Sequence, residues 1–131
     1  MMQSFQVETD AREAMIDITG RLEELLREAG AQSGIMTVYT PHTTTGLTIN
    51  EGADPDVRRD ILAHLRVMVP KHAGFRHAEG NSDAHIKATL LGSSVQIIVE
   101  RGRLVLGTWQ RVFLGEFDGP RRRTLHVTIL S

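Results

Sequence analysis

Three of the six histidines in this chain occupy positions where side chains could meet to do chemistry. His42 follows a β-branched apolar stretch, His77 lies in a polar, glycine-containing segment, and His85 begins the next helical stretch. Neutral imidazole is a common ligand of zinc-like ions, and three imidazoles leave a fourth coordination position open. Their spacing matches no compact metal motif such as HExxH. Spacing alone therefore leaves two interpretations open: a shared metal site, or three unrelated polar histidines.

Two carboxylates follow the first of these histidines at an expected strand-to-helix junction. Glu51 and Asp54 could orient a metal-bound imidazole, or one of them could act as a general base. However, Asp54 directly precedes Pro55, and an acid before a proline at the first helical position is typical of a helix cap. Capping and a role in a site both stay open for Asp54.

An uninterrupted run of threonines, Thr43, Thr44 and Thr45, lies beside His42. Their hydroxyls could donate to a phosphate, or they could satisfy their own backbone in a turn. The chain has no GxxxxGK[ST], GxGxxG or GxSxG motif, which excludes the usual nucleotide-binding loops and one class of hydrolase. We regard Thr44 and Lys87 as candidates for contacting an anionic group.

The composition limits the class of protein. The formal charge of −1 and pI of about 6.6 give no reason to expect a nucleic-acid partner or an anionic membrane surface. The absence of cysteine excludes disulfides, thiolate catalysis and cysteine-based metal sites. The N-terminal segment does not resemble a signal peptide, and no apolar run is long enough to span a bilayer. We therefore expect a cytoplasmic protein.

The elements that must position these residues follow from the apolar pattern. Alternation predicts strands over residues 4–8, 13–19, 34–40, 45–50, 94–100, 103–117 and 124–130. Helical spacing predicts helices from Thr19 to a stop at Gly30, from Asp54 to Pro70, and from a cap at Asp83 to Gly92. Short turns between the last three strands favour an antiparallel meander.

Helices lie among these strands without a regular βαβ rhythm, which favours an α+β fold. We expect one domain, residues 1–131, built as a mainly antiparallel β-sandwich with two or three helices packed on it.

Three segments together resemble the YjbQ family of small bacterial and archaeal proteins, often described as secondary thiamine-phosphate synthases. They are HTTTGLTINEGADPDVRRDIL, FRHAEGNSDAHIKATLLG and GRLVLGTWQRVFLGEFDGPRRRTLHV, and they cover nearly the whole chain in the expected order. The resemblance implies an antiparallel sandwich, assembly as a homotrimer, and a histidine-rich metal pocket. Thr45 stands where members of that family commonly have alanine, which adds a hydroxyl near the pocket.

Carried over residue by residue, the resemblance makes His42, His77 and His85 the metal ligands, and three imidazoles favour zinc or a similar transition ion. The segments Asn50–Glu51, Asp54–Pro55 and GTWQ match as well. The expected catalytic residues are Glu51 and Asp54, and the expected substrate-binding residues are Thr44, Asn50, Lys87, Trp109 and Gln110.

These residues support three hypotheses about function. The first is a metal-dependent enzyme acting on a small phosphorylated metabolite, with thiamine-phosphate-synthase-like transfer or metal-dependent hydrolysis as the reaction. Three imidazoles suit zinc and hydrolysis better than magnesium and the release of a diphosphate. The alternative is a non-catalytic metal- or metabolite-binding trimer. In the third hypothesis, the histidines only bridge subunits.

Overall fold

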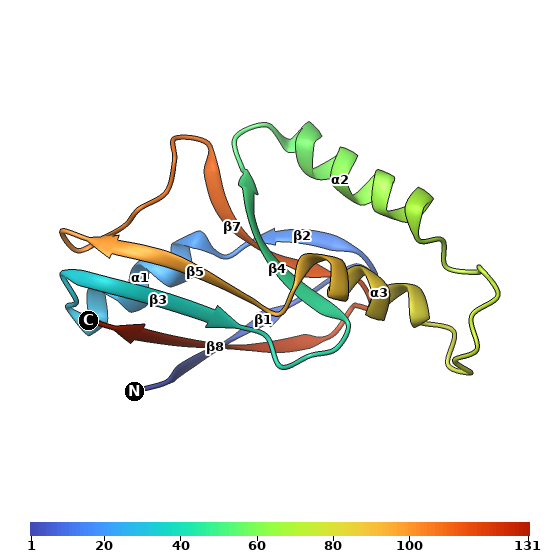
Figure 1. The fold of residues 1–131 in the computed structure, drawn as a ribbon, viewed down its shortest axis with the longest axis horizontal. Coiled ribbons are helices and arrows are strands. Elements are labelled where there is room, and N and C mark those ends of the chain that lie inside the picture. The colour runs from blue at the N-terminus through green and yellow to red at the C-terminus, as the bar shows by residue number, and fades with distance from the viewer.

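A computed structural model describes all residues, 1–131, as two antiparallel sheets with three helices (Figure 1). The strands are β1 (Gln3–Glu8), β2 (Ala14–Asp17), β3 (Ser33–Tyr39), β4 (Thr45–Glu51), β5 (Ser94–Glu100), β6 (Arg103–Leu104), β7 (Gln110–Glu116) and β8 (Arg122–Leu130). The helices are α1 (Thr19–Ala29), α2 (Pro55–Met68) and α3 (Ser82–Leu91). The expected α+β architecture dominated by antiparallel strands is confirmed. No helix is long and apolar enough to cross a bilayer.

The larger sheet has the strand order β1-β8-β3-β5-β6, and the smaller sheet has the order β2-β7-β4. Alternate residues of each strand face the space between the sheets, as period-two patterns require. Met36 and Val38 of β3 pack there against Leu47 of β4 and Leu114 of β7, and all four are buried. This shared core sets the two sheets face to face.

Helix α1 closes one side of the core with Leu22 and Leu26, which are both buried. It ends at Gly30, whose φ of 69° is left-handed and whose N–H donates to the carbonyl of Leu26. Glycine is the residue that adopts this conformation without steric cost, so the predicted stop at Gly30 is confirmed.

Helix α3 lies against the outer face of the smaller sheet because two glycines leave room for it. Gly46 of β4 and Gly115 of β7 are paired in register. A Cβ at Gly46 would lie 2.6 Å from Cβ of Leu91, and a Cβ at Gly115 would lie 2.7 Å from Cδ2 of Leu91. Both distances are far shorter than van der Waals contact. The glycine pair therefore fixes the close approach of α3, and so the position of His85.

Helix α2 begins as the sequence predicts. The side chain of Asp54 accepts a hydrogen bond from the N–H of Asp56 at 2.9 Å, and Pro55 occupies the first turn. No residue of α2 is buried, although the partly buried Leu62 and Leu65 pack against the cluster of Ala84, Ala88 and Phe117. Figure 1 shows α2 standing away from the sheets and returning through a long loop to α3.

Two expectations about the last third of the chain are wrong. Residues 103–117 do not form one strand, because the chain leaves the larger sheet after β6 and enters the smaller sheet at β7. Gln110 closes this crossing, since its N–H donates to the carbonyl of Gly107 and its Oε1 accepts from the N–H of Gly107. Of the expected meander only the β5–β6 hairpin forms: β5 pairs with β3 and β6, β7 with β2 and β4, and β8 with β1 and β3.

The expected cap of the third helix is also wrong. Asn81 precedes α3, and Asp83 lies inside its first turn, where it is completely buried. An exposed capping carboxylate would not need partners, but a buried one does. Asp83 finds them in Arg12 and Lys87.

Candidate functional site

A polar pocket of about 380 Å³ lies where the β3–β4 loop, the start of α3 and the β7–β8 loop meet. No hydrophobic side chain lines it. The lining residues are Pro41, His42, Thr43, Thr44, Glu79, Asn81, His85, Asp118, Arg121 and Arg123. The pocket therefore gathers three of the predicted site residues with several residues that the sequence did not single out.

Arg123 forms the buried floor of this pocket. Its side chain is 2% exposed and donates from Nε and Nη2 to the two carboxylate oxygens of Glu116, which is completely buried. Nη2 also donates to the hydroxyl of Thr44 at 2.9 Å. A two-point pairing of this kind fixes the plane of the guanidinium as well as its position. The floor is thus a rigid, oriented cation.

Glu116 is held ionised by its neighbours. Burial alone would raise the pKa of Glu116, but hydrogen bonds from Arg123, Thr9 and the N–H of Asp118 outweigh burial and hold that pKa below its ordinary value. Because Glu116 uses both carboxylate oxygens on these donors, it serves to position Arg123. The Nη1 of Arg123 makes no hydrogen bond within the chain and is not among the fully buried unpaired atoms.

The β7–β8 loop brings a second cation to the pocket. Arg121 is half-exposed and donates from Nη2 to Oδ2 of Asp118 at 3.2 Å, and Oδ2 also accepts from the amide of Asn81. Tight packing of Gly119 holds this loop: a Cβ there would lie 2.3 Å from the carbonyl oxygen of Ala11. Asp118 and Arg121 are therefore presented from a loop that has little freedom to move.

His42 is held in place by a hydrogen bond from the backbone of β8. The N–H of Thr124 donates to its Nε2 at 2.9 Å. Burial lowers the pKa of His42 below its ordinary value, and the positive charge of Arg123 acts in the same direction. The structure thus favours a neutral imidazole at this wall of the pocket.

His77 and His85 lie close together, because only the short segment 78–81 separates His77 from the start of α3. Their rings meet edge to face with centroids 5.6 Å apart. Nε2 of His77 lies 3.8 Å from a carboxylate oxygen of Glu79, which lines the pocket. His85 lines the pocket, whereas His77 lines a neighbouring hollow of the 71–82 segment.

The threonine run divides between the two roles left open by the sequence. Thr44 accepts from Arg123, and Thr45 shares a 2.7 Å hydrogen bond with the hydroxyl of Thr40; all of these side chains are buried. Thr43 is exposed and lines the pocket. The hydroxyl of Thr45 therefore serves the internal structure, that of Thr44 supports Arg123, and that of Thr43 is accessible to a ligand.

Lys87 lies outside the pocket. Its side chain is 1% exposed, and its Nζ donates to Glu13 at 2.7 Å and to Asp83 at 3.0 Å. Glu13 also pairs with Arg66 of α2. This buried network ties α3 and α2 to the segment before β2, so a ligand would reach Lys87 only by displacing a carboxylate.

The remaining predicted residues lie at the other end of β4. Asn50 and Glu51 end that strand, and a seven-residue strand separates its ends by roughly 20 Å. Glu51 accepts from the N–H groups of Ala53 and Asp54, and Asn50 accepts from the N–H of Glu51. These oxygens therefore organise the entry to α2. We call this region the far end; it includes Trp109, which is 63% exposed, and Gln110.

The residues present do not fit the three-imidazole metal site that the resemblance implies. No three His, Asp or Glu side chains in the chain are arranged to hold an ion. Nε2 of His42 is directed at a backbone N–H, and two arginines line the same pocket. A cation placed among them would be repelled by Arg121 and Arg123.

Sequence reasoning missed Arg121, Arg123, Glu116, Asn81 and Asp118. A run of three arginines after Gly119–Pro120 is typical of a solvated turn, and a nearby carboxylate such as Glu116 is typical of a surface partner for such a run. A weak signal was present, because the strand pattern places Arg123 on the same face as Leu125 and Val127, which are both buried. An arginine on a buried face requires a buried acceptor.

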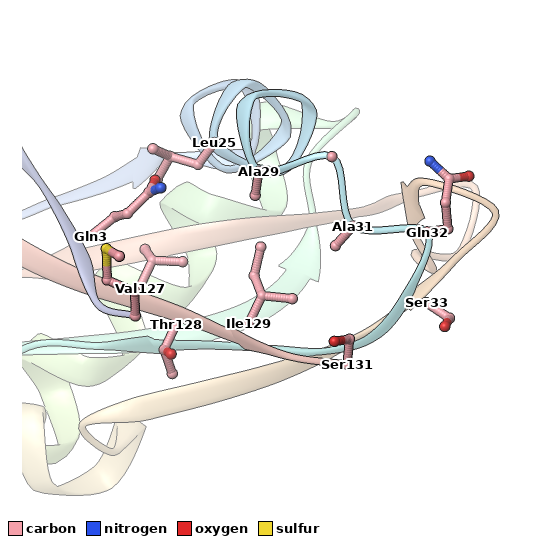
Figure 2. Close-up of a pocket in the computed structure, with 12 residues that line it drawn as sticks. Gln3, Leu25, Ala29, Ala31, Gln32, Ser33, Val127, Thr128, Ile129 and Ser131 are labelled. Atoms are coloured by element: carbon pink, nitrogen blue, oxygen red, sulfur yellow. The ribbon is translucent and has the colours of Figure 1, made fainter.

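A larger cavity, of about 540 Å³, lies beside the C-terminal end of α1 and the ends of β8 and β3 (Figure 2). Figure 2 shows Val127 and Ile129 of β8 pointing towards Leu25 and Ala29 of α1, with Thr128 on the other side of the strand. No His, Asp, Glu, Lys or Arg side chain lines this cavity. The size of a cavity therefore does not show which cavity holds side chains that could bind a charged ligand or take part in a reaction.

The fold and the pocket define a small α+β protein in which two facing antiparallel sheets present a polar, arginine-floored pocket at one end. Residues 3–131 match the family described as UPF0047 protein YjbQ-like. The chain belongs to this family.

Two relatives cover its whole length. UPF0047 protein YugU of Bacillus subtilis is 48% identical, with 100% of each chain covered. A UPF0047 protein of Methanocaldococcus jannaschii is also 48% identical, covering 100% of this chain and 95% of the relative. The crystal structure of a YjbQ/UPF0047 protein of Clostridium acetobutylicum is 50% identical and has a TM-score of 0.96, covering 98% of this chain and 99% of that one.

Proposed function

We propose that the pocket floored by Arg123 binds the phosphoryl group of a small phosphorylated metabolite. The observation that carries this proposal is the buried guanidinium of Arg123, fixed by Glu116 and Thr44 and left with an Nη1 that no group of the chain occupies. Arginine presents planar, directional donors that match phosphate oxygens. Its fixed orientation removes part of the entropic cost of binding.

The other accessible groups also favour an anion over a cation. Arg121 adds a second guanidinium, and Thr43 adds an exposed hydroxyl. Two carboxylates line the pocket as well, but Asp118 accepts from Arg121 and Asn81, and the exposed Glu79 lies near His77. The deepest charge, Arg123, is therefore positive, while Glu79 is free to turn towards solvent.

The donor set does not support a metal-dependent reaction at this pocket within one chain, so we assign no step to a metal ion. A phosphorylated ligand is what a thiamine-phosphate-synthase-like reaction would also require, and an assay for turnover separates that reaction from binding alone. Turnover of phosphorylated substrates would make the protein an enzyme. Binding without turnover, with or without added Zn²⁺, would make it a metabolite-binding protein.

The test uses pyrophosphate and inorganic phosphate as probes in isothermal titration calorimetry at constant ionic strength. Arg121→Gln should weaken binding roughly ten- to a hundredfold, because a hydrogen bond to a charged group contributes about 1.5–3 kcal/mol. Arg121 is half-exposed, so this change should leave the fold intact.

Arg122→Gln is the matched control. It removes the same charge from the next residue, but Arg122 is largely exposed, pairs with Glu8 and does not line the pocket. Its affinity should stay within about twofold of the wild type, as expected for a screened surface charge. Absence of binding by the wild type, or equal losses in both variants, would refute the proposal.

We also propose that the chain assembles as the homotrimer expected from the resemblance. Ile35, Ile98 and Leu130 lie side by side across the outer face of the larger sheet, and all three are exposed. Such a row is unusual for a surface in contact with water. Ile98→Glu should lower the mass measured by light scattering from that of a trimer; an unchanged mass would count against this face.

A further inference from the structure

His42 uses one of its ring nitrogens as an acceptor. A backbone N–H can only donate, so the 2.9 Å contact from Thr124 requires a lone pair on Nε2. A neutral imidazole with its lone pair on Nε2 carries its proton on Nδ1. Turning the ring over would place Cε1 against the N–H of Thr124 and leave it without a partner. The orientation and the tautomer therefore follow from one contact.

The groups around the ring keep it neutral. Burial and the charges of Arg123 and Arg121 lower the pKa of His42, and together they outweigh the charge of Glu116, which acts in the other direction. A second proton would have to be placed on Nε2, against the N–H of Thr124. Protonation would therefore break the contact that orients the ring.

Nδ1 is accessible. It makes no hydrogen bond within the chain, and the fully buried polar atoms that lack a partner are Nε of Arg58 and Oδ1 of Asn81. His42 lines the polar pocket and also the adjoining hollow bounded by Tyr39 and Thr89. A donor at this position can reach a molecule bound between the two.

We propose that His42 is a ligand-binding residue that donates from Nδ1–H to an anionic oxygen of the phosphorylated ligand. The proposal rests on the proposed function of the same pocket. It also states what His42 does not do: in this tautomer neither nitrogen offers a lone pair to a metal ion, because Nε2 accepts from Thr124 and Nδ1 is protonated. A metal at Nδ1 would require the proton on Nδ1 to be lost, or to move to Nε2, where it would displace the N–H of Thr124.

The tautomer is measured directly on the protein without ligand. Long-range ¹H–¹⁵N correlation spectra of protein labelled with ¹⁵N-histidine should show Nε2 of His42 as the unprotonated, pyridine-type nitrogen and Nδ1 as the protonated one. The signal is assigned by its loss in His42→Gln. An Nε2-protonated or doubly protonated ring at pH 7 would overturn the proposal, whatever the protein binds.

Two amide substitutions separate the two nitrogens. The amide of Asn occupies the position of Nδ1, so His42→Asn keeps the donor to the ligand but removes the acceptor for Thr124. The oxygen of Gln reaches the position of Nε2, so His42→Gln keeps that acceptor but removes the donor. Pyrophosphate affinity should fall roughly tenfold in His42→Gln, as for other hydrogen bonds to charged groups, and by less than about threefold in His42→Asn.

Stability should follow the opposite order. His42→Asn leaves a backbone N–H without its partner and should lower the unfolding midpoint in urea, whereas His42→Gln should stay close to the wild type. If His42→Gln binds pyrophosphate as the wild type does, the ring has only a structural role and the proposal fails. If the wild type binds neither pyrophosphate nor phosphate, the proposed function and the donor role fail together, while the spectrum still decides the tautomer.

Discussion

The two ends of β4 carry similar residue types but use them differently. At the pocket end, side chains from four separate segments converge, and the charged pair at the floor is buried and shares its hydrogen bonds across the sheets. At the far end, Asn50, Glu51 and Asp54 bond to backbone groups one to three residues away. The resemblance assigns both sets to one site, yet roughly 20 Å separates the ends of the strand.

This difference shows what distinguishes a site from a polar junction. Where the chain changes direction, local side chains can satisfy the free backbone N–H groups, and no contact from elsewhere in the fold is needed. The pocket needs Glu116, Thr44 and Arg123 to meet from three strands or loops, which only tertiary structure provides. Residues at the far end can take part in ligand binding only if a second copy of the chain brings them to the pocket.

The largest effect should come from breaking the buried pair at the pocket end. Glu116→Leu leaves Arg123 buried without its counter-ion and should cost about 3–5 kcal/mol of the free energy of unfolding. Urea denaturation measures this cost. The double variant Glu116→Leu/Arg123→Leu removes both charges and should recover much of the stability; equal losses in the single and double variants would mean that the pairing is unimportant.

Acid should weaken the buried ion pairs, both at the floor of the pocket and around Lys87. Glu116, Asp83 and Glu13 each have a pKa held below its ordinary value by arginine or lysine partners that outweigh burial. The unfolded state then binds more protons, so this stability is complete above a pH of about 4.3 and is lost as the pH falls through the folded-state pKa values. Each such carboxyl adds a slope of at most about 1.4 kcal/mol per pH unit.

Urea denaturation across pH 2.5 to 7 measures that slope. Asp83→Asn removes one titrating group and should flatten the curve below pH 4.3, although it will also lower stability at pH 7. A wild-type stability that does not change over this range would contradict the assignment of these carboxylates as buried, paired anions.

At the far end, the effects should be smaller and should leave ligand binding intact. Asp54→Ala removes the cap of α2 and should cost about 1 kcal/mol. Circular dichroism followed during urea denaturation would show the loss, and Asp54→Asn, which keeps a capping oxygen, is the matched control. A tenfold loss of pyrophosphate affinity in either variant would place Asp54 in the site after all.

The smallest effect on stability should come from Trp109→Phe. Trp109 is 63% exposed in the single chain, and exposed substitutions change stability by about 0.5 kcal/mol or less. Affinity for pyrophosphate should be unchanged. If Trp109→Phe weakens binding while the fold stays intact, then a neighbouring subunit brings the far end to the pocket, and the separation of the two ends holds only within one chain.

Much of the secondary structure is predictable because it depends on neighbours. The stop at Gly30, the cap at Asp54 and the strands around Met36 and Ile97 follow from local conformational preference and from apolar period. The single strand expected over residues 103–117 is wrong because the local pattern cannot show a change of sheet. Residues on both sides of Gly107 alternate like a strand, but β6 pairs in the larger sheet and β7 in the smaller one.

The candidate site was predictable only in part. His42, Thr44 and His85 reach the pocket, and His77 packs against His85, because loops at the ends of rigid elements are where binding side chains concentrate. The arginine floor had only a weak signal, since Arg121, Arg122 and Arg123 look alike in the sequence and only the alternation of Arg123 with Leu125 and Val127 sets it apart. Their environments differ because the strand turns one of them inward to Glu116.

The sequence by itself determined the α+β class, the antiparallel strands, the helix boundaries at glycine and proline, and the resemblance to the family. These properties depend on the conformational preferences and burial of residues close together in the chain. Tertiary structure alone decided which polar residues meet: it placed Arg123 in one pocket with His42, buried Lys87, and separated Glu51 from the pocket. Contacts between distant segments depend on sheet pairing and register, and these are determined by the shared core between the two sheets.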